Sequence, residues 1–240
     1  MAQYIYGRNT VLSALKEHKV KAIYIADGFS LFSILDEIKK QNITAKTSSK
    51  QELNRMAQNG NHQGVVAEIE DYKYASLEEI IKKAKKSQYP LIVILDGVKD
   101  PQNLGAILRS CDAFGANGII LKKNGQVGVN STVAKVSTGA IDFVPVAMVT
   151  NLVQAIKTLK NNGYWIVGSD GSAKQDYREI DYKCPIALVV GSEGEGISRL
   201  VLENCDFISK ITMVGHVNSL NASVATAVYL AQIFNNRFPS

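Results

Sequence analysis

Four loops in the C-terminal half of the chain combine glycine with polar and charged side chains. They span residues 96–105, 168–171, 191–196 and 215–223. Carboxylates, amides, hydroxyls and the backbone groups that glycine leaves open can hold a polar ligand and take part in proton transfer. Each loop taken alone is also compatible with an ordinary turn, in which glycine supplies backbone freedom and Asn or Ser caps the next helix.

Arg109 differs from its neighbours because it lies in a segment otherwise lined by apolar residues, six positions after Asn103. A cation beside an apolar stripe is unfavourable unless it meets an anion or extends its charged end into water. Two interpretations stay open. Arg109 can pair with Asp112 as a structural ion pair, or it can face a phosphate.

The spacing of other residues excludes several familiar sites. Glycines 191, 194 and 196 form GxxGxG with two glutamates between them, GxGxxG is absent after the first strand of the predicted sheet, and no GxxxxGK[ST] occurs. An acidic loop of this kind does not suit a pyrophosphate. The three cysteines and three histidines are scattered, so we expect no disulfide framework, no Ser-His-Asp triad and no metal site.

The loops follow apolar runs that must position them. Six such runs lie at 91–95, 118–121, 143–147, 164–168, 186–190 and, more mixed, 207–212, and helices are predicted at 103–114, 151–162 and 219–235. Alternating helices and fully apolar strands are typical of a parallel sheet covered on both faces. Ligands bind at the carboxyl ends of the strands in such sheets. We therefore expect an α/β fold in which the four loops share one edge.

The first 70 residues have shorter alternating segments. Helices are predicted at 9–17, 30–41 and 50–58, and strands at 22–26, 43–46 and 64–69, which gives a small α/β domain. Ser76 and Glu79 form a capping box that begins a lysine-rich helix, and Pro90 ends this region. We interpret it as a linker, so the predicted organisation is a domain at 1–70, a linker at 71–89 and a second domain at 90–240.

The composition of the 240 residues is that of a globular protein, with 46% hydrophobic and 20% charged residues. No apolar run approaches the ~18 residues of a membrane helix. The N-terminus lacks the features of a secretory signal, so we expect a cytoplasmic protein. A net charge of +5 mildly favours an anionic partner such as RNA, but the excess is spread along the chain and does not by itself identify one.

Three stretches, in this order, resemble the signature motifs of the SpoU-type RNA 2'-O-ribose methyltransferases, the TrmH family of the SPOUT class. They are LDGVKDPQNLGAILRSCDAFG at 95–115, ALVVGSEGEGIS at 187–198 and ITMVGHVNSLNASVATAVYL at 211–230. The HQGV stretch at 62–65 and its domain resemble the family's L30e-like substrate-binding domain. The resemblance covers nearly the whole chain. In layout it is most similar to the bacterial 23S rRNA guanosine-2'-O-methyltransferases.

This resemblance implies a C-terminal domain with a deep trefoil knot, through which the protein forms a homodimer. It implies S-adenosylmethionine as the methyl donor and a ribose of ribosomal RNA, most specifically a guanosine of 23S rRNA, as the acceptor. The same reaction on a tRNA loop and a non-catalytic RNA-binding module are the alternatives. The family's catalytic positions correspond to Asn103, Arg109, Glu193, Ser219 and Asn221, and its donor-contacting positions to Val167, Gly168, Gly191, Ile211 and Leu220.

The resemblance also implies roles. Arg109 contacts the ribose 2'-hydroxyl and the adjoining phosphate, Ser219 and Asn221 orient the phosphate or the ribose, and Asn103 and Glu193 fix Arg109 and the architecture of the loops. We expect Arg109 to act as a charged clamp rather than as a general base, because guanidinium stays protonated in proteins. Thr212 departs from the motif, which usually has proline there.

RNA recognition is expected in the first domain, where a hairpin loop would be read by shape and by unpaired bases. The tyrosines at positions 4, 6 and 24 either stack on bases or belong to a half-buried core. The candidate RNA-binding residues are Arg8, Arg55, His62 and Gln63.

Overall fold

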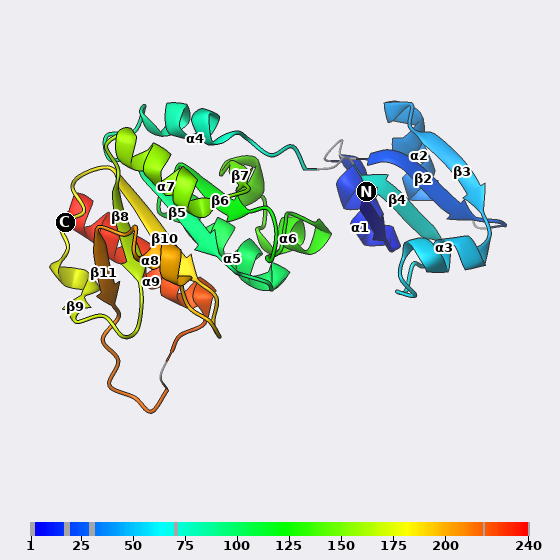
Figure 1. Ribbon diagram of the computed structural model, residues 1–240. Coiled ribbons are helices and arrows are strands. Elements are labelled where there is room, and N and C mark those ends of the chain that lie inside the picture. The colour runs from blue at the N-terminus through cyan, green and yellow to red at the C-terminus, as the bar shows by residue number, and fades with distance from the viewer. Residues whose placement is uncertain (1–2, 17–19, 29–31, 70–71, 218, 240) are drawn as a thin grey trace. The chain divides into compact units, whose positions relative to one another are not determined.

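The computed structural model describes residues 3–16, 20–28, 32–69, 72–217 and 219–239. It divides into two compact units, Met1–Lys73 and Tyr74–Ser240 (Figure 1). No helix within the described ranges is long and apolar enough to cross a membrane.

The first unit is a four-stranded sheet with helices on both faces. The strands have the order β1-β4-β2-β3, and only the β2–β3 pair is parallel. Apolar side chains of α1 and α2 pack on one face of this sheet, and those of α3 pack on the other. The elements are β1 (Gln3–Tyr6), α1 (Arg8–Lys16), β2 (Val20–Ala26), α2 (Phe32–Gln41), β3 (Thr44–Ser48), α3 (Lys50–Met56) and β4 (Val65–Ile69).

The second unit contains a seven-stranded sheet in the order β7-β6-β5-β10-β8-β11-β9, in which every strand pair is parallel. The predicted parallel α/β sheet is thereby confirmed. The strands are β5 (Leu91–Asp96), β6 (Gly118–Lys122), β7 (Val146–Val149), β8 (Trp165–Ser169), β9 (Gln175–Asp176), β10 (Ile186–Gly191) and β11 (Phe207–Lys210).

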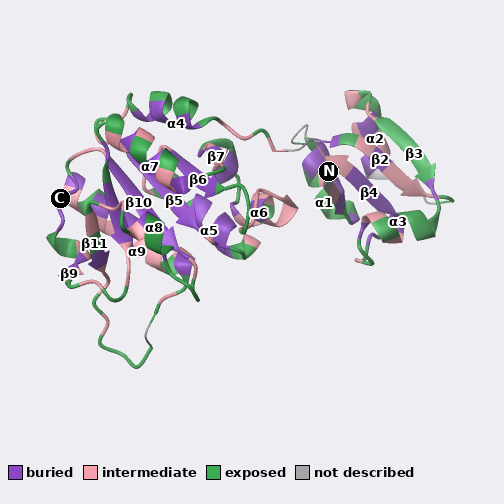
Figure 2. Cartoon of the chain, in the orientation of Figure 1, coloured by how far each residue is buried: buried purple, intermediate pink, exposed green. Residues whose placement is uncertain are grey.

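Helices cover both faces of this sheet, and the central strands between them are buried (Figure 2). One face packs against α4, α7 and α8, which share one apolar cluster with β5, β6 and β10. On the other face α5 packs against α6 and α9. The helices are α4 (Leu77–Ala84), α5 (Pro101–Ala113), α6 (Ser131–Val136), α7 (Leu152–Asn161), α8 (Arg199–Leu202) and α9 (Ala222–Arg237), with short 3-10 turns at Ala140–Asp142 and Tyr177–Glu179.

Helix α4 differs from the expectation of a linker at 71–89. The predicted capping box is present, since Ser76 Oγ accepts a hydrogen bond from the Glu79 N–H at 3.1 Å and Glu79 Oε2 accepts one from the Ser76 N–H at 2.7 Å. However, α4 buries Ile80 and Ile81 in the core of the second unit, and Gly118 leaves the room that Ile80 fills. Its lysines lie on the opposite, exposed side of an amphipathic helix.

Some element boundaries also differ. Residues 143–145 follow a 3-10 turn, and β7 begins only at Val146. The strand expected at 207–212 ends at Lys210, and the chain then runs into an irregular segment. Strand β1 was not predicted, because four residues give too short a pattern to read.

Candidate active site

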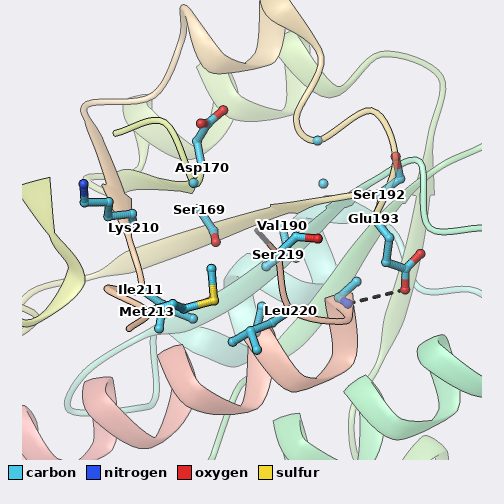
Figure 3. A pocket seen from close by; sticks show the side chains of 15 residues that line it. Ser169, Asp170, Val190, Ser192, Glu193, Lys210, Ile211, Met213, Ser219 and Leu220 are labelled. Carbon is cyan, nitrogen blue, oxygen red and sulfur yellow. Dashed lines mark hydrogen bonds between the residues drawn. The ribbon is translucent and has the colours of Figure 1, made fainter. Parts of the chain in front are cut away.

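A pocket of about 200 Å³ opens at the carboxyl ends of β8, β10 and β11, beside the start of α9. The sequence predicted a ligand site at this edge. In Figure 3, Ile211, Met213 and Leu220 lie together, with Asp170 and Lys210 toward one end of the pocket and the loop at 192–193 toward the other. The lining residues are Ser169, Asp170, Gly171, Val190, Gly191, Ser192, Glu193, Gly196, Lys210, Ile211, Met213, Ser219, Leu220, Ala222 and Ala225.

The loop after β10 folds back so tightly that two of its glycines, Gly191 and Gly196, are required. A Cβ atom at Gly191 would collide with the backbone of Gly196, and Gly196 itself has φ +67°. Ser192 and Gly196 close the loop with two backbone hydrogen bonds of 3.2 and 3.0 Å. This turn places the side chain of Glu193 beside the N-terminus of α9.

Three of the predicted catalytic residues meet in one hydrogen-bonded cluster. Asn103 Nδ2 donates to Glu193 Oε1 at 2.5 Å, and Asn221 Nδ2 donates to Asn103 Oδ1 at 3.0 Å and to Glu193 Oε1 at 3.2 Å. The backbone N–H of Ala222 also donates to Glu193 Oε1, at 3.4 Å. Asn103 comes from the first turn of α5 and Asn221 caps α9, so Glu193 joins three segments that are far apart in the chain.

Both ends of the Asn221 amide are engaged. Its Oδ1 accepts from the N–H groups of Ser223 and Val224 at the start of α9, and this leaves Nδ2 to donate to the cluster. One oxygen of Glu193, Oε1, accepts all three bonds, so this carboxylate ties the loop after β10 to the starts of α5 and α9. The negative charge at the N-terminus of α9 is also favoured by the helix dipole.

Arg109 lies elsewhere. It is exposed on α5 and is absent from the pocket lining. Six residues of helix turn it about 240° around the axis from Asn103, so the two side chains leave α5 in different directions. Within the described ranges it makes no ion pair with Asp112. A single chain therefore does not bring Arg109 to the cluster, and its catalytic role stays a prediction.

The predicted donor-contacting residues separate into two groups. Gly191, Ile211 and Leu220 line the pocket, as does the predicted catalytic residue Ser219. Val167 is fully buried in the sheet, and Gly168 faces away from the pocket, since a Cβ there would lie 3.0 Å from Cys205 Sγ.

The chain reaches the pocket only at the residues that follow, Ser169, Asp170 and Gly171. The Ser-Asp-Gly sequence after an apolar run was the available signal for them. Lys210 and Met213 also line the pocket. They were not predicted as site residues, because the sequence around them gave no comparable signal.

The segment that carries Ile211 and Met213 is tied to the edge of the sheet. Thr212 Oγ1 donates to Asp176 Oδ2 at 2.5 Å, and Arg178 donates to the same carboxylate from Nε at 2.7 Å and from Nη2 at 3.2 Å. The Arg178 side chain and then the Thr212 hydroxyl hold the pKa of Asp176 well below its usual range. Thr212, the departure from the family motif, thus ties this segment to β9 through a hydrogen bond that proline could not donate.

In the first unit, three of the four predicted RNA-binding residues lie in one loop cluster. Gln63 Oε1 accepts a hydrogen bond from the Arg8 N–H at 3.1 Å and so caps the start of α1. The His62 ring is buried: Nδ1 accepts from the Gly64 N–H at 3.1 Å, which leaves Nε2 to donate to Asn54 Oδ1 at 3.1 Å. His62 therefore shapes the loop, whereas Arg8, Arg55 and Gln63 are exposed.

The described residues contain no group of three or more side chains that could hold a metal ion.

Comparison with known proteins gives a consistent result over both units. Residues 90–231 match the model of the SpoU rRNA Methylase family, and residues 4–75 match the model described as RNA 2'-O ribose methyltransferase substrate binding. The chain is 44% identical over 241 residues to YacO of Bacillus subtilis (strain 168), which carries the name TrmH family tRNA/rRNA methyltransferase. That alignment covers 98% of this chain and 96% of YacO.

Two solved structures extend the likeness. An AdoMet-bound rRNA methyltransferase from Sinorhizobium meliloti is 26% identical, with a TM-score of 0.75, and the match covers 100% of this chain and 88% of that one. The A. aeolicus TrmH/SpoU tRNA modifying enzyme is 34% identical, with a TM-score of 0.57, over 67% of this chain and 82% of that one.

Proposed function

The chain belongs to the SpoU rRNA methylase family of RNA 2'-O-methyltransferases, and from this premise we propose that it methylates a ribose of ribosomal RNA with S-adenosylmethionine as donor. The observation that carries the proposal is the Asn103–Glu193–Asn221 cluster beside a pocket at the carboxyl edge of the sheet. We further propose a guanosine of 23S rRNA as the target.

The pocket suits the donor by its chemistry. Ile211, Met213 and Leu220 offer an apolar surface for adenine, and Asp170 and Lys210 offer opposite charges for the amino and carboxyl groups of the methionine part. When bound, S-adenosylmethionine supplies a methyl group on a positively charged sulfur. We keep Gly191, Ile211 and Leu220 as donor contacts and add Ser169 and Gly171 in place of Val167 and Gly168.

The side chains around the pocket have separate tasks in this proposal. A ribose hydroxyl is a weak nucleophile, so positioning it accounts for much of the rate. Ser219 and Asn221 orient the ribose or its phosphate, while Asn103 and Glu193 keep Asn221 in place. Arg109 holds the phosphate and lowers the pKa of the hydroxyl by its charge, and solvent or phosphate accepts the proton.

A homodimer explains how Arg109 can take part. An apolar groove of about 420 Å³ runs between α5 and α9, lined by Ala106, Ser110, Phe114, Ser223, Val224, Ala227, Val228 and Ala231. We propose that a second copy covers this groove through the same surface, as a two-fold contact requires. The groove includes Ser223 and Val224 in the first turn of α9, next to the donor pocket, and Arg109 lies on α5 between Ala106 and Ser110. Covering the groove would bring one chain's Arg109 toward its partner's pocket.

Ribosomal RNA is favoured over tRNA by the first unit. The S. meliloti rRNA methyltransferase matches the whole chain, whereas the A. aeolicus tRNA modifying enzyme matches 67% of it. The substrate-binding model matches residues 4–75.

The trefoil knot that the family resemblance implies for the second unit stays a prediction.

The test is a map of 2'-O-methyl groups in RNA from cells with and without this gene. We expect one methyl group to be missing from 23S rRNA in the deletion strain and to return when the gene is restored. Loss of a methyl group from a tRNA alone would overturn the rRNA assignment and leave the chemistry intact.

A further inference from the structure

One end of the sheet in the first unit carries a hydrogen-bonded cluster of loops. The end of β1, the start of α1 and residues 57–64 meet there through the Arg8–Gln63 bond and a bond of 3.2 Å from the Gly7 N–H to the Val65 carbonyl. Among the described residues, five that are not glycine have positive φ, and three of them, Gln58, Asn59 and Gln63, lie in this one loop. Strained backbone of this kind gathers where a chain presents a functional surface.

Tyr6 projects from this cluster in an unusual way. It is 40% exposed, although the two residues before it in β1, Tyr4 and Ile5, pack against apolar clusters. A Cβ atom built on Gly60 would collide with Cζ, Oη and Cε2 of Tyr6. The ring therefore rests directly on the backbone of Gly60, where any other residue would displace it.

The other two tyrosines on this face of the sheet, Tyr4 and Tyr24, make contacts within the protein. The rings of Tyr4 and Tyr24 pack edge to face with centroids 6.1 Å apart. Tyr24 also donates to Glu68 Oε2 at 3.1 Å, and both rings pack on the apolar cluster beneath α3. Of the three tyrosines that the sequence offered for base stacking, Tyr6 alone is classed as exposed.

The surroundings of Tyr6 fit one nucleotide of an unpaired strand. An aromatic ring provides a stacking surface for any base, and a cation beside it suits the adjoining phosphate. Arg8 lies two residues after Tyr6 with an exposed side chain, and Gln63 is exposed on the neighbouring loop.

We propose that Tyr6, supported by Gly60, stacks on one unpaired base of the RNA substrate, with Arg8 beside it for the phosphate. This inference rests on the proposed function, because it takes RNA as the substrate. It names the residue through which the first unit distinguishes a loop from a duplex.

The test uses the full-length protein and RNA hairpins that carry the fluorescent base 2-aminopurine at each loop position in turn. We expect binding to quench the fluorescence at one position, because stacking on the Tyr6 ring quenches this base. Tyr6→Ala should abolish the quenching and weaken hairpin binding about 5- to 150-fold, the range that one base–aromatic stack provides. Tyr6→Phe, which keeps the ring, should retain both signals.

Two further variants separate stacking from folding. Gly60→Ala should displace the ring and reproduce the Tyr6→Ala result, whereas Tyr24→Phe, which removes a hydroxyl on the same sheet face, should bind like the parent. Binding to a duplex with the same stem should be equal for all variants, as should calorimetric binding of S-adenosylmethionine.

Two results would overturn the stacking proposal. One is parental hairpin binding by Tyr6→Ala, and the other is an equal loss on hairpin and duplex. A parent protein that binds S-adenosylmethionine but neither RNA would also overturn it and leave the donor site standing, whereas absence of donor binding would contradict the proposed function itself.

Discussion

At the scale of single residues, Asn221 carries the most connections in the site. Its Oδ1 caps α9 and its Nδ2 donates to both Asn103 and Glu193. Aspartate at this position could still cap the helix, but it would replace the donor with a second carboxylate next to Glu193. The amide is thus needed for the cluster and not for the helix.

We therefore predict that Asn221→Asp lowers kcat for methyl transfer roughly 10- to 100-fold, since a hydrogen bond to a charged group contributes about 1.5–3 kcal/mol. Steady-state kinetics with rRNA measure this effect. Asn151→Asp is the matched control, because Asn151 caps α7 in the same way, through Gln154, outside the pocket lining. Equal rates for the two variants would contradict the role of the cluster.

Tyr164 provides a prediction on stability at the same scale. Its hydroxyl is buried and has no hydrogen-bond partner among the described residues, and burial raises its pKa to about 12. Tyr164→Phe should raise the free energy of unfolding by about 1 kcal/mol, because it removes an unsatisfied polar group. The gain should grow from pH 10 toward pH 12, where tyrosine ionises in the unfolded chain but stays neutral in the folded one. Urea unfolding at pH 7 and pH 10.5 tests both statements, and a less stable variant would contradict them.

At the scale of elements, the carboxylate of Asp176 connects the edge strand β9 to the segment that lines the pocket. The pKa of Asp176 is lower in the folded chain than in the unfolded chain, where it is about 3.9. The ionised carboxylate therefore stabilises the folded state at pH values above about 3.9. This stabilisation is lost as the pH falls from there toward the pKa of the folded state. We predict that Asp176→Asn weakens this dependence, so that stability declines less between pH 4 and pH 2 than in the parent. Urea unfolding across this range measures the slope, and equal slopes would contradict the prediction.

The end of α9 is fixed by a buried arginine. Arg237 donates to the carbonyl groups of Tyr89, Pro90, Tyr182 and Cys184, and burial lowers its pKa to about 10. Arg237→Met should lower the free energy of unfolding by about 2–4 kcal/mol, because it leaves buried carbonyls without donors. Arg199→Met, at an exposed ion pair, should change it by less than about 1 kcal/mol in the same urea titration. Similar losses in both variants would contradict this account of α9.

The elements also show what sequence patterns can and cannot predict. Apolar runs predicted the strands of the second unit because strands buried on both faces leave a strong signal, as in Ile186–Gly191. The linker interpretation of residues 71–89 overlooked the apolar face of α4, although Leu77, Ile80, Ile81 and Ala84 recur there at helical spacing. The family resemblance placed two donor contacts at Val167 and Gly168, whereas the pocket lining on this strand begins at Ser169.

The candidate site could likewise be predicted only in part from the sequence. Asn103, Glu193 and Asn221 are far apart in sequence. The strand pattern placed their loops at one edge of the sheet, and the family resemblance singled out these three side chains. Nothing in the sequence could show that His62 is buried, whereas the six-residue spacing of Asn103 and Arg109 on a predicted helix already implied different directions. Those facts depend on packing and on helix geometry.

At the scale of the whole molecule, the proposed homodimer predicts that two variants, each impaired alone, recover activity when they are mixed. A monomeric enzyme would show no such recovery. Arg109→Ala and Asn221→Asp should each have strongly reduced activity alone. If Arg109 acts at the partner's pocket, a mixed dimer of the two variants contains one intact site. Equal mixing after subunit exchange should then restore about a quarter of the parent activity per chain.

No recovery in the mixed sample, with exchange verified by affinity tags, would contradict this arrangement. Elution of the parent as a monomer of 26.1 kDa would contradict the dimer itself.

The most direct measurement of the central claim uses the purified protein, S-adenosylmethionine with an isotopically labelled methyl group, and unmodified rRNA and tRNA in parallel. Mass spectrometry of the digested nucleosides identifies the labelled atom. We predict a single labelled 2'-O-methylguanosine in 23S rRNA, strongly reduced with Asn221→Asp. Label on a base, or no label in either RNA despite donor binding, would contradict the account.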